Sequence, residues 1–244
     1  VQGNCKESLS LLTEAIKAKK HDYWMAKFRE LEEQERAAVV QHDITPTKEG
    51  LTMGEVIHHI NQYKADDAVL VTDVGQHQMI AWRYFNYKKP RTQVTSGGLG
   101  TMGFALPAAL GAQLFDYSRQ VICVVGDGGI QMTIQELGTI KQTKAPVKIV
   151  LLNNNYLGMV RQWQQMFFDK RYSFTELDNP DFIMLAEAYG IKAQKVSDRA
   201  DLQEAVEDML IHDGPYFLEV VVEKEDNVFP MIATGCSVEE VRLS

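Results

Sequence analysis

Short, almost purely apolar runs recur along this chain and constrain its fold more than any other feature. The clearest are residues 68–72, 121–125, 147–152 and 216–222. Runs of this length without polar alternation are typical of strands buried on both faces of a parallel sheet. Segments with apolar residues at helical spacing lie between them, such as the one around Leu202. Alternation of this kind predicts an α/β fold.

Weaker signals complete the expected order of elements. Two further short strands are predicted, at residues 93–95 and 192–196. Thr52 and Glu55 have the spacing of a capping box at the start of a helix. The remaining helices are predicted at 1–20, 21–45, 52–63, 76–85, 103–115, 132–142, 159–168, 182–189 and 202–210. The sequence therefore predicts a doubly wound, mostly parallel six-stranded sheet with helices on both faces.

We expect two parts in the chain. Residues 46–244 carry the alternating pattern and form the main domain, whereas residues 1–45 are helical and dense in charge toward their end. The sequence begins with Val1, as a fragment of a longer chain would, so the lack of a targeting signal carries little weight.

Composition excludes some classes of function. A net charge of -8 gives no basic surface for nucleic acid, and no apolar run is long enough to cross a membrane. Cys5, Cys123 and Cys236 lie too far apart in sequence to suggest a zinc site or a disulfide framework. We expect a reducing compartment: the bacterial cytoplasm, or an organelle in a eukaryote.

Polar or glycine-rich loops follow four of the predicted strands. They span residues 73–78, 96–103, 126–129 and 153–159. Ligands of doubly wound sheets bind outside the carboxyl ends of the strands, so these loops are the candidate site.

One interpretation of these loops is a dinucleotide site. Gly98, Gly100 and Gly103 form G-x-G-x-x-G, and Asp127 follows 24 residues later, near the expected position of a ribose-binding acid. The preceding strand at 91–95 is polar for the central strand of such a fold, and this interpretation gives the asparagines at 153–155 no role.

A second interpretation is a metal–diphosphate site. Asp127, Asn154 and one backbone carbonyl would supply three of the six oxygens that Mg²⁺ requires, and phosphate and water would supply the others. The glycines around Asp127 leave room for phosphate beside the backbone. Helices beginning near Gly129 and Gly158 would direct their positive ends toward the anion.

The two halves of this second site resemble a known fingerprint. Gly126-Asp127-Gly128, with Asn154 following 27 residues after the aspartate, is similar to the signature of thiamin diphosphate (ThDP)-dependent enzymes. The surrounding sequence resembles the catalytic subunit of the acetohydroxyacid synthase (acetolactate synthase) family from about residue 46 to Val241. The resembling segments are residues 72–79, 96–113, 132–137, 152–164, 179–190 and 228–231. Residues 1–45 look like the end of that family's middle domain and its connector.

The resemblance implies a role for each matching residue. Mg²⁺ would be bound by the side chains of Asp127 and Asn154 and by the carbonyl of Tyr156. The Gly100 carbonyl would accept a hydrogen bond from the aminopyrimidine, and Met102 would hold the cofactor bent. Met159 and Trp163 would line the substrate channel. The diphosphate and its surroundings would be contacted by Gly75, Gln76, His77, Gly126, Gly128, Gly129, Leu157, Gly158 and Met159.

Without the resemblance, some of these residues have plainer interpretations. His77 is equally consistent with a surface histidine, and Met159 and Trp163 are typical of a helix core. Glu136, about two turns into its predicted helix, is expected to be a surface or packing residue rather than the acid that activates the cofactor.

The resemblance also implies an activity. Two pyruvates, or pyruvate and 2-ketobutyrate, would condense to an acetohydroxyacid with release of CO₂, which is the first common step of branched-chain amino acid synthesis. ThDP serves as the electron sink in this transferase reaction. Alternatives are another ThDP-dependent 2-keto acid decarboxylase or carboligase, a NAD-binding module, and a fragment that binds nothing alone.

The family's other requirements would come from outside these residues. Its activating glutamate belongs to an N-terminal domain and acts across a dimer interface, and its FAD is held mainly by a middle domain. We therefore expect no catalytic acid here, an inactive isolated fragment, a homodimer or higher homo-oligomer, and a regulatory small subunit as a further partner.

Overall fold

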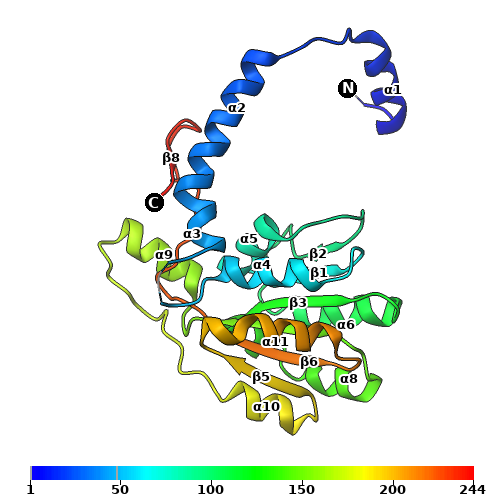
Figure 1. The fold of residues 1–244 in the computed structure, drawn as a ribbon, viewed down its shortest axis with the longest axis vertical. Helices are drawn as coiled ribbons and strands as arrows, with labels where there is room; N and C mark the ends of the chain where they lie inside the picture. Colours follow the sequence, from blue (N-terminus) through cyan, green and yellow to red (C-terminus); the bar gives the residue numbers. More distant parts are fainter. Residues whose placement is uncertain (1, 48) are drawn as a thin grey trace.

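A six-stranded parallel sheet organises the protein, in a computed structural model that describes residues 2–47 and 49–244. The strand order is β2-β1-β3-β4-β6-β5, and every neighbouring pair is parallel. This confirms the predicted doubly wound fold (Figure 1). The strands are β1 (Val69–Thr72), β2 (Gln93–Thr95), β3 (Val121–Gly126), β4 (Lys148–Asn153), β5 (Lys192–Val196) and β6 (Tyr216–Val221).

The strands that were predicted from apolar runs occupy the middle of the sheet. Val71 pairs with Cys123, and Val124 pairs with Val150 in the next strand. Every residue of β1, β3 and β4 is buried. Cys123 is buried among them, which raises the pKa of its thiol, so it serves as a small apolar core residue.

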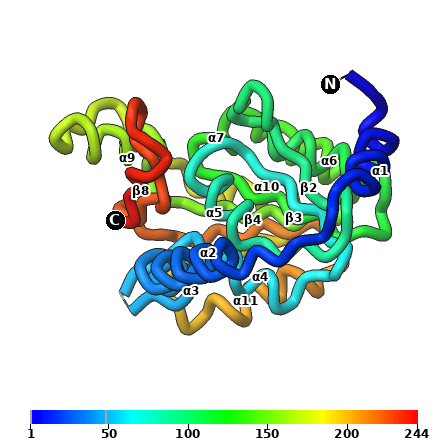
Figure 2. The backbone as a smooth tube through the Cα atoms, turned by 90° about the horizontal axis from the view of Figure 1, so that it is seen from above, coloured from blue at the N-terminus to red at the C-terminus, as the bar shows by residue number. Residues whose placement is uncertain are grey.

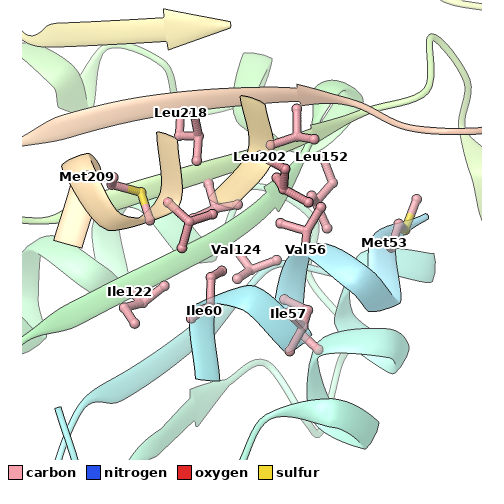
Figure 3. Packing of buried hydrophobic residues seen from close by; sticks show 14 of the residues in the cluster. Met53, Val56, Ile57, Ile60, Ile122, Val124, Leu152, Leu202, Met209 and Leu218 are labelled. Atoms are coloured by element: carbon pink, nitrogen blue, oxygen red, sulfur yellow. The ribbon is translucent and has the colours of Figure 1, made fainter. Parts of the chain in front are cut away.

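Helices cover one face of the sheet with a continuous apolar core. The residues that point to this face include Ile122, Val124 and Leu218 (Figure 3). They pack against α4 (Met53–Tyr63), α5 (Gln76–Tyr84) and α11 (Arg199–Ile211). The predicted capping box at the start of α4 is present, because Glu55 N donates to Thr52 Oγ1 (3.2 Å) and Thr52 N donates to Glu55 Oε1 (3.1 Å).

A second core lies on the opposite face. Strand residues alternate in direction, so Val121, Cys123 and Val125 point away from the first core. They pack against α6 (Ala105–Phe115), α7 (Asp127–Gln131), α8 (Glu136–Thr143) and α10 (Phe182–Ala188). Helices on both faces were predicted from the sequence, and the two cores confirm that arrangement.

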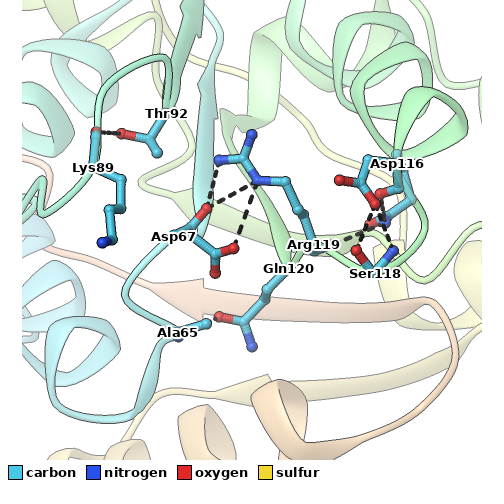
Figure 4. A network of polar contacts seen from close by, with 9 residues as sticks. Ala65, Asp67, Lys89, Thr92, Asp116, Ser118, Arg119 and Gln120 are labelled. Atoms are coloured by element: carbon cyan, nitrogen blue, oxygen red, sulfur yellow. Dashed lines mark hydrogen bonds and ion pairs between the residues drawn. The ribbon is translucent and has the colours of Figure 1, made fainter.

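Polar contacts tie the loops together near the beginnings of β1 and β3 (Figure 4). Arg119 Nη2 donates to the carbonyl of Asp67 (2.6 Å), and Ala65 N donates to Gln120 Oε1 (3.0 Å). These bonds fix the amino ends of the strands, opposite the edge where the polar loops gather.

The first helices extend away from the sheet (Figure 1), and the view from above looks down on them (Figure 2). The predicted helix at 1–20 is shorter, since α1 (Cys5–Ala15) begins after the capping side chain of Asn4 and contains no buried residue. Its apolar side chains, Leu9 and Leu12 among them, are more than half exposed, so the predicted amphipathic face has no partner among the described residues.

The charged segment that follows is helical, as predicted. It consists of α2 (Asp22–Glu35), a π-helical stretch η1 (Arg36–Val40) and α3 (Gln41–Ile44). An ion pair between Glu35 and Arg83 joins it to α5.

For the helix predicted at 132–142, the predicted first residue is wrong. A short helix, α7, begins at Asp127 itself, and α8 begins only at Glu136. Thr133 lies between them and donates its hydroxyl to the carbonyl of Gly103 (2.9 Å), a long-range bond that the periodicity of the sequence does not reveal.

After β6, the chain ends in a small antiparallel pair, β7 (Met231–Ile232) and β8 (Val241–Arg242). Among the described residues, none of the helices has both the length and the apolar character needed to cross a bilayer. α9 (Gly158–Phe167) lies at the carboxyl edge of the sheet and forms part of the site.

Candidate cofactor site

A cavity opens at the carboxyl ends of β1, β3 and β4. Its volume is about 80 Å³, and it lies where the chain reverses direction along the sheet, between β1 and β3. This is the expected ligand position in a doubly wound sheet. All but two of the predicted site residues line it: Gly75, Gln76, His77, Met102, Gly126, Asp127, Gly128, Gly129, Asn154, Tyr156, Leu157, Gly158 and Met159.

Gly100 and Trp163 are the two predicted residues that do not line this cavity. Gly100 has φ +63° and turns the loop that carries Met102. Trp163 is 38% exposed and packs against Phe167, with ring centroids 4.9 Å apart. Its helical spacing alone suggested a core position for Trp163, and the structure shows that this interpretation is wrong.

Asp127 is the first residue after β3 and is almost fully buried. Burial raises the pKa of its carboxyl to about 6, although hydrogen bonds from Asn179 and from backbone amides act in the opposite direction. One carboxylate oxygen accepts from Asn179 Nδ2 (2.8 Å), and the other accepts from the amide of Gly128 (3.2 Å). No salt bridge to this carboxylate occurs among the residues that the structure describes.

Asn154 and Tyr156 follow the neighbouring strand, β4. Asn154 Oδ1 accepts from the amide of Tyr156 (3.1 Å), and its Nδ2 faces Gln76 Oε1 (3.5 Å), which fixes the orientation of the amide group. Tyr156 forms an antiparallel bridge with Glu176, and the bonds of this bridge are made by the residues on either side of Tyr156. In such a pair the central carbonyl points away from the partner strand, to the same side as its own amide and Asn154.

Gln76 and His77 begin α5 and are both buried. Gln76 Nε2 donates to Gln162 Oε1 (2.9 Å). Burial lowers the pKa of His77 to about 4 against the opposing charge of Asp73, so its ring is neutral at neutral pH. His77 Nε2 has no hydrogen-bond partner among the described residues, which is unusual for a buried polar atom. His77 is therefore not an ordinary surface histidine.

Close contacts explain the glycines of the site. A Cβ on Gly128 would lie 2.7 Å from Leu157 Cδ2, and one on Gly158 would lie 2.1 Å from Gln76 Oε1. Side chains at these positions would displace the groups that line the cavity. Room for phosphate was the reason predicted for the glycines around Asp127, and these protein contacts are a further cause that the sequence does not reveal.

Three residues outside the predicted set shape the site. Buried Asp73 accepts hydrogen bonds from the amides of Gly103 (3.0 Å) and Ala105 (2.9 Å), and so anchors the loop that carries Met102. Gln162 holds Gln76, and Asn179 holds Asp127. Asp73 could have been found from the sequence, because it is an acid directly after a buried strand, as Asp127 is. Asn179 could not, because it follows none of the strands and lies far in sequence from Asp127.

The G-x-G-x-x-G loop does not have the setting of a dinucleotide site. It follows β2, which is an edge strand, and β1 separates that strand from β3 and Asp127. A dinucleotide fingerprint requires a central strand with the acid at the end of an adjacent strand. In addition, Leu99 within the loop is 94% exposed.

The residues that are present fit a divalent cation with a diphosphate. A carboxylate, an amide oxygen and a backbone carbonyl lie on two adjacent strand ends, and these are ligand types that Mg²⁺ accepts. The first amides of α9 are donors for an anion, and His77 lines the same cavity.

Comparisons with known proteins agree with this geometry. The family model described as "Thiamine pyrophosphate enzyme, C-terminal TPP binding domain" matches residues 73–220. Among solved structures, the thiamine diphosphate-dependent 4-hydroxybenzoylformate decarboxylase of Rhodococcus jostii RHA1 is similar, with a TM-score of 0.68 and 29% identity. That match covers 74% of this chain and 34% of the decarboxylase.

Curated relatives are more similar in sequence. The acetolactate synthase isozyme 2 large subunit of Escherichia coli (strain K12) is 49% identical over 187 residues, covering 76% of this chain and 34% of the relative. The mitochondrial acetolactate synthase of Schizosaccharomyces pombe is 39% identical over 241 residues, covering 96% of this chain and 36% of the relative. The chain spans about a third of the length of these relatives.

Proposed function

Because this chain belongs to the thiamine pyrophosphate enzyme family through its C-terminal TPP binding domain, we propose that its cavity binds ThDP with Mg²⁺ in an acetolactate synthase. One observation carries this proposal: Asp127, Asn154 and Tyr156 meet at the ends of β3 and β4 beside a glycine-lined cavity. The names of relatives that are 39–49% identical support the activity.

Each predicted site residue has a role in this proposal, including Gly100 and Trp163 outside the cavity lining. Asp127, Asn154 and the carbonyl of Tyr156 would hold Mg²⁺, which would supply positive charge for binding the diphosphate. The Gly100 carbonyl and Met102 orient the aminopyrimidine, and Met159 and Trp163 face the substrate. The diphosphate is held by the backbone near Gly75 and Gly126, by the backbone of Gly128, Gly129, Leu157 and Gly158, and by the side chains of Gln76 and His77.

The protein's contribution to the chemistry is binding, orientation and exclusion of water. When bound, ThDP would supply the electron sink for loss of CO₂ from pyruvate and for transfer of the remaining two-carbon unit to a second 2-keto acid. Neutral His77 donates or accepts a hydrogen bond without adding charge, and the buried setting of Asp127 strengthens its attraction for a cation. The substrates are two pyruvates, or pyruvate and 2-ketobutyrate, in branched-chain amino acid synthesis.

Further features belong to the full-length protein in this proposal. Residues 46–244 form the cofactor-binding domain, and residues 1–45 connect it to a preceding domain. The full-length protein holds FAD, assembles as a homodimer or higher homo-oligomer, and receives its activating glutamate from another domain. We also propose that the full-length protein binds a regulatory small subunit and is located in the bacterial cytoplasm or, in a eukaryote, in an organelle.

Ligand-dependent thermal stability tests the cofactor. ThDP with Mg²⁺ should raise the melting temperature of the full-length protein far more than NAD does, and EDTA should abolish the shift. Asp127→Ala should remove the Mg²⁺-dependent shift, whereas Asp22→Ala, which changes an exposed aspartate of α2, should retain it. A shift with NAD that persists in EDTA would contradict the metal site.

Product analysis tests the substrate. With pyruvate, the full-length protein should form acetolactate, whereas acetaldehyde would indicate a simple decarboxylase. Formation of acetaldehyde would support the alternative function, which the similarity to a ThDP-dependent decarboxylase favours.

A further inference from the structure

Asn179 lies in a segment that is held against the β4–α9 loop. Leu157 N donates to the carbonyl of Thr175 (2.7 Å), and Leu177 N donates to the carbonyl of Asn155 (2.8 Å). On its other side, Asp181 caps α10 by accepting from the amide of Met184 (2.9 Å). Asn179 is therefore anchored on both sides in sequence, and the position of its side chain is determined by the fold.

The amide group of Asn179 joins both strand ends of the proposed metal site. Its Nδ2 lies 2.8 Å from Asp127 Oδ2, 3.0 Å from Asn155 Oδ1 and 3.2 Å from Asn153 Oδ1. Its Oδ1 accepts from Gln131 Nε2 (3.0 Å), which also donates to the carbonyl of Asp127 (3.0 Å). The bond from Gln131 fixes which side of the amide faces Asp127, because only Oδ1 can accept it.

These contacts continue into the sheet. Asn153 Nδ2 donates to Glu219 Oε1 (2.8 Å), and the buried carboxylate of Glu219 pairs with Lys195 Nζ (3.0 Å). Asn153 Oδ1 also accepts from the amide of Asn155 (3.0 Å), which has a left-handed backbone. A connected polar network thus runs from β5 to Asp127 and fixes each amide in one orientation.

Asn179 supports Asp127 without neutralising it. The side chain of Asn179 is a neutral donor, so its hydrogen bond orients the carboxylate and leaves its full negative charge for a cation. An arginine or lysine in the same place would compete with the metal. Partners of this kind behind the direct ligands keep the ligand geometry ready before the metal arrives.

We propose that Asn179 is a positioning residue for the metal site, which sets the affinity for the divalent cation by holding the Asp127 carboxylate against the β4–α9 loop. The proposal rests on the proposed function of this cavity. It assigns a role to the asparagine of the Asn179-Pro180-Asp181-Phe182 segment. This segment does not directly follow a strand, and none of the roles given above places it against phosphate or substrate.

Metal titration of the full-length protein tests this role. At a fixed ThDP concentration, Asn179→Ala should raise the Mg²⁺ concentration for half-maximal ThDP binding about 10–100-fold, the usual effect of losing a residue that supports metal ligands. ThDP affinity should return to the parental level at saturating Mg²⁺, which a general folding defect would not allow. Asn86→Ala, at an exposed asparagine remote from the cavity, is the matched control and should leave the titration unchanged.

Gln131→Met provides a second variant in case Asn179→Ala does not fold. It removes the donor that orients the Asn179 amide, so it should shift the titration in the same direction by a smaller factor. Unchanged Mg²⁺ dependence in the Asn179 or Gln131 variants overturns this proposal alone. Absence of any Mg²⁺ dependence in the parental protein overturns the proposed function, and this role with it.

Discussion

The imidazole of His77 lies directly against the backbone of Gly126. A Cβ built on Gly126 would be 2.8 Å from His77 Nδ1, and one on Gly75 would be 2.9 Å from His77 Cε1. Both glycines, at the end of β3 and at the start of α5, therefore face the Nδ1–Cε1 edge of the ring. This contact, rather than backbone conformation, explains Gly126, since its φ is -93°.

Gly126→Ala should destabilise the protein and weaken ThDP binding. The new methyl group would overlap the buried ring of His77, so we expect a cost of about 1–3 kcal/mol in the free energy of unfolding. Gly111→Ala is the matched control: this helical glycine has no atom near its Cβ position, and the change should stabilise by about 0.5–1 kcal/mol. Urea denaturation measures both, and equal effects would refute the steric argument.

Asp127 should make the metal-free protein less stable as the pH rises. Its folded pKa, about 6, lies above the ordinary 3.8, so folding favours the protonated form. Its stabilising contribution is thus complete below about pH 4 and is lost as the pH rises through 6. The loss is on the order of 2–3 kcal/mol, since each pKa unit corresponds to about 1.4 kcal/mol.

Asp127→Asn should remove this pH dependence. In EDTA, the variant should gain stability relative to the parental protein between pH 4 and pH 7, with a constant difference above that range. Urea denaturation at several pH values measures the difference, and Asp22→Asn, at an exposed site, serves as the control. A difference that does not vary with pH would show that Asp127 is not perturbed by burial.

Asp73→Asn should loosen the loop that carries Met102. The carboxylate of Asp73 accepts hydrogen bonds from two backbone amides, and asparagine would place its NH₂ group against one of them. One buried donor would then lose its partner, which should lower the free energy of unfolding by about 1–3 kcal/mol. Hydrogen exchange should become faster at Gly103 and Ala105. Asp66→Asn, which breaks only an exposed pair with Lys88, should change stability by less than about 1 kcal/mol. Unchanged exchange at both amides would count against the anchoring role.

Arg161→Lys should destabilise the proposed metal-binding loop although it preserves the charge. The Arg161 guanidinium is 5.1 Å from the ring centre of Tyr156 and 4.5 Å from that of Tyr172, and it pairs with Glu225 (3.0 Å). A lysine ammonium cannot stack on both rings and pair with Glu225 at the same time. We therefore expect the free energy of unfolding to fall by about 1–3 kcal/mol. Arg171→Lys, at an exposed arginine, is the control. Thermal melts that do not distinguish the two variants would contradict this role.

The sequence sufficed for the architecture because its signals are local. Apolar runs marked β1, β3, β4 and β6, and a capping box marked the start of α4. Boundaries set by distant contacts were not predictable. The separation of α7 from α8 depends on a bond from Thr133 to Gly103, and the exposed face of α1 depends on the absence of packing partners among the described residues.

Within the site, the sequence by itself determined the chemical types and their places at strand ends: Asp127, Asn154 and the glycines around them. Only the tertiary structure decided which distant residues complete it. Asn179, Asp73 and Gln162 act through hydrogen bonds that span 30 to 86 residues. The sheet order also removed the dinucleotide alternative, since it places β2 at the edge. The physical reason is that strand order and side-chain contact are long-range properties, whereas periodicity and turn chemistry are written locally in the chain.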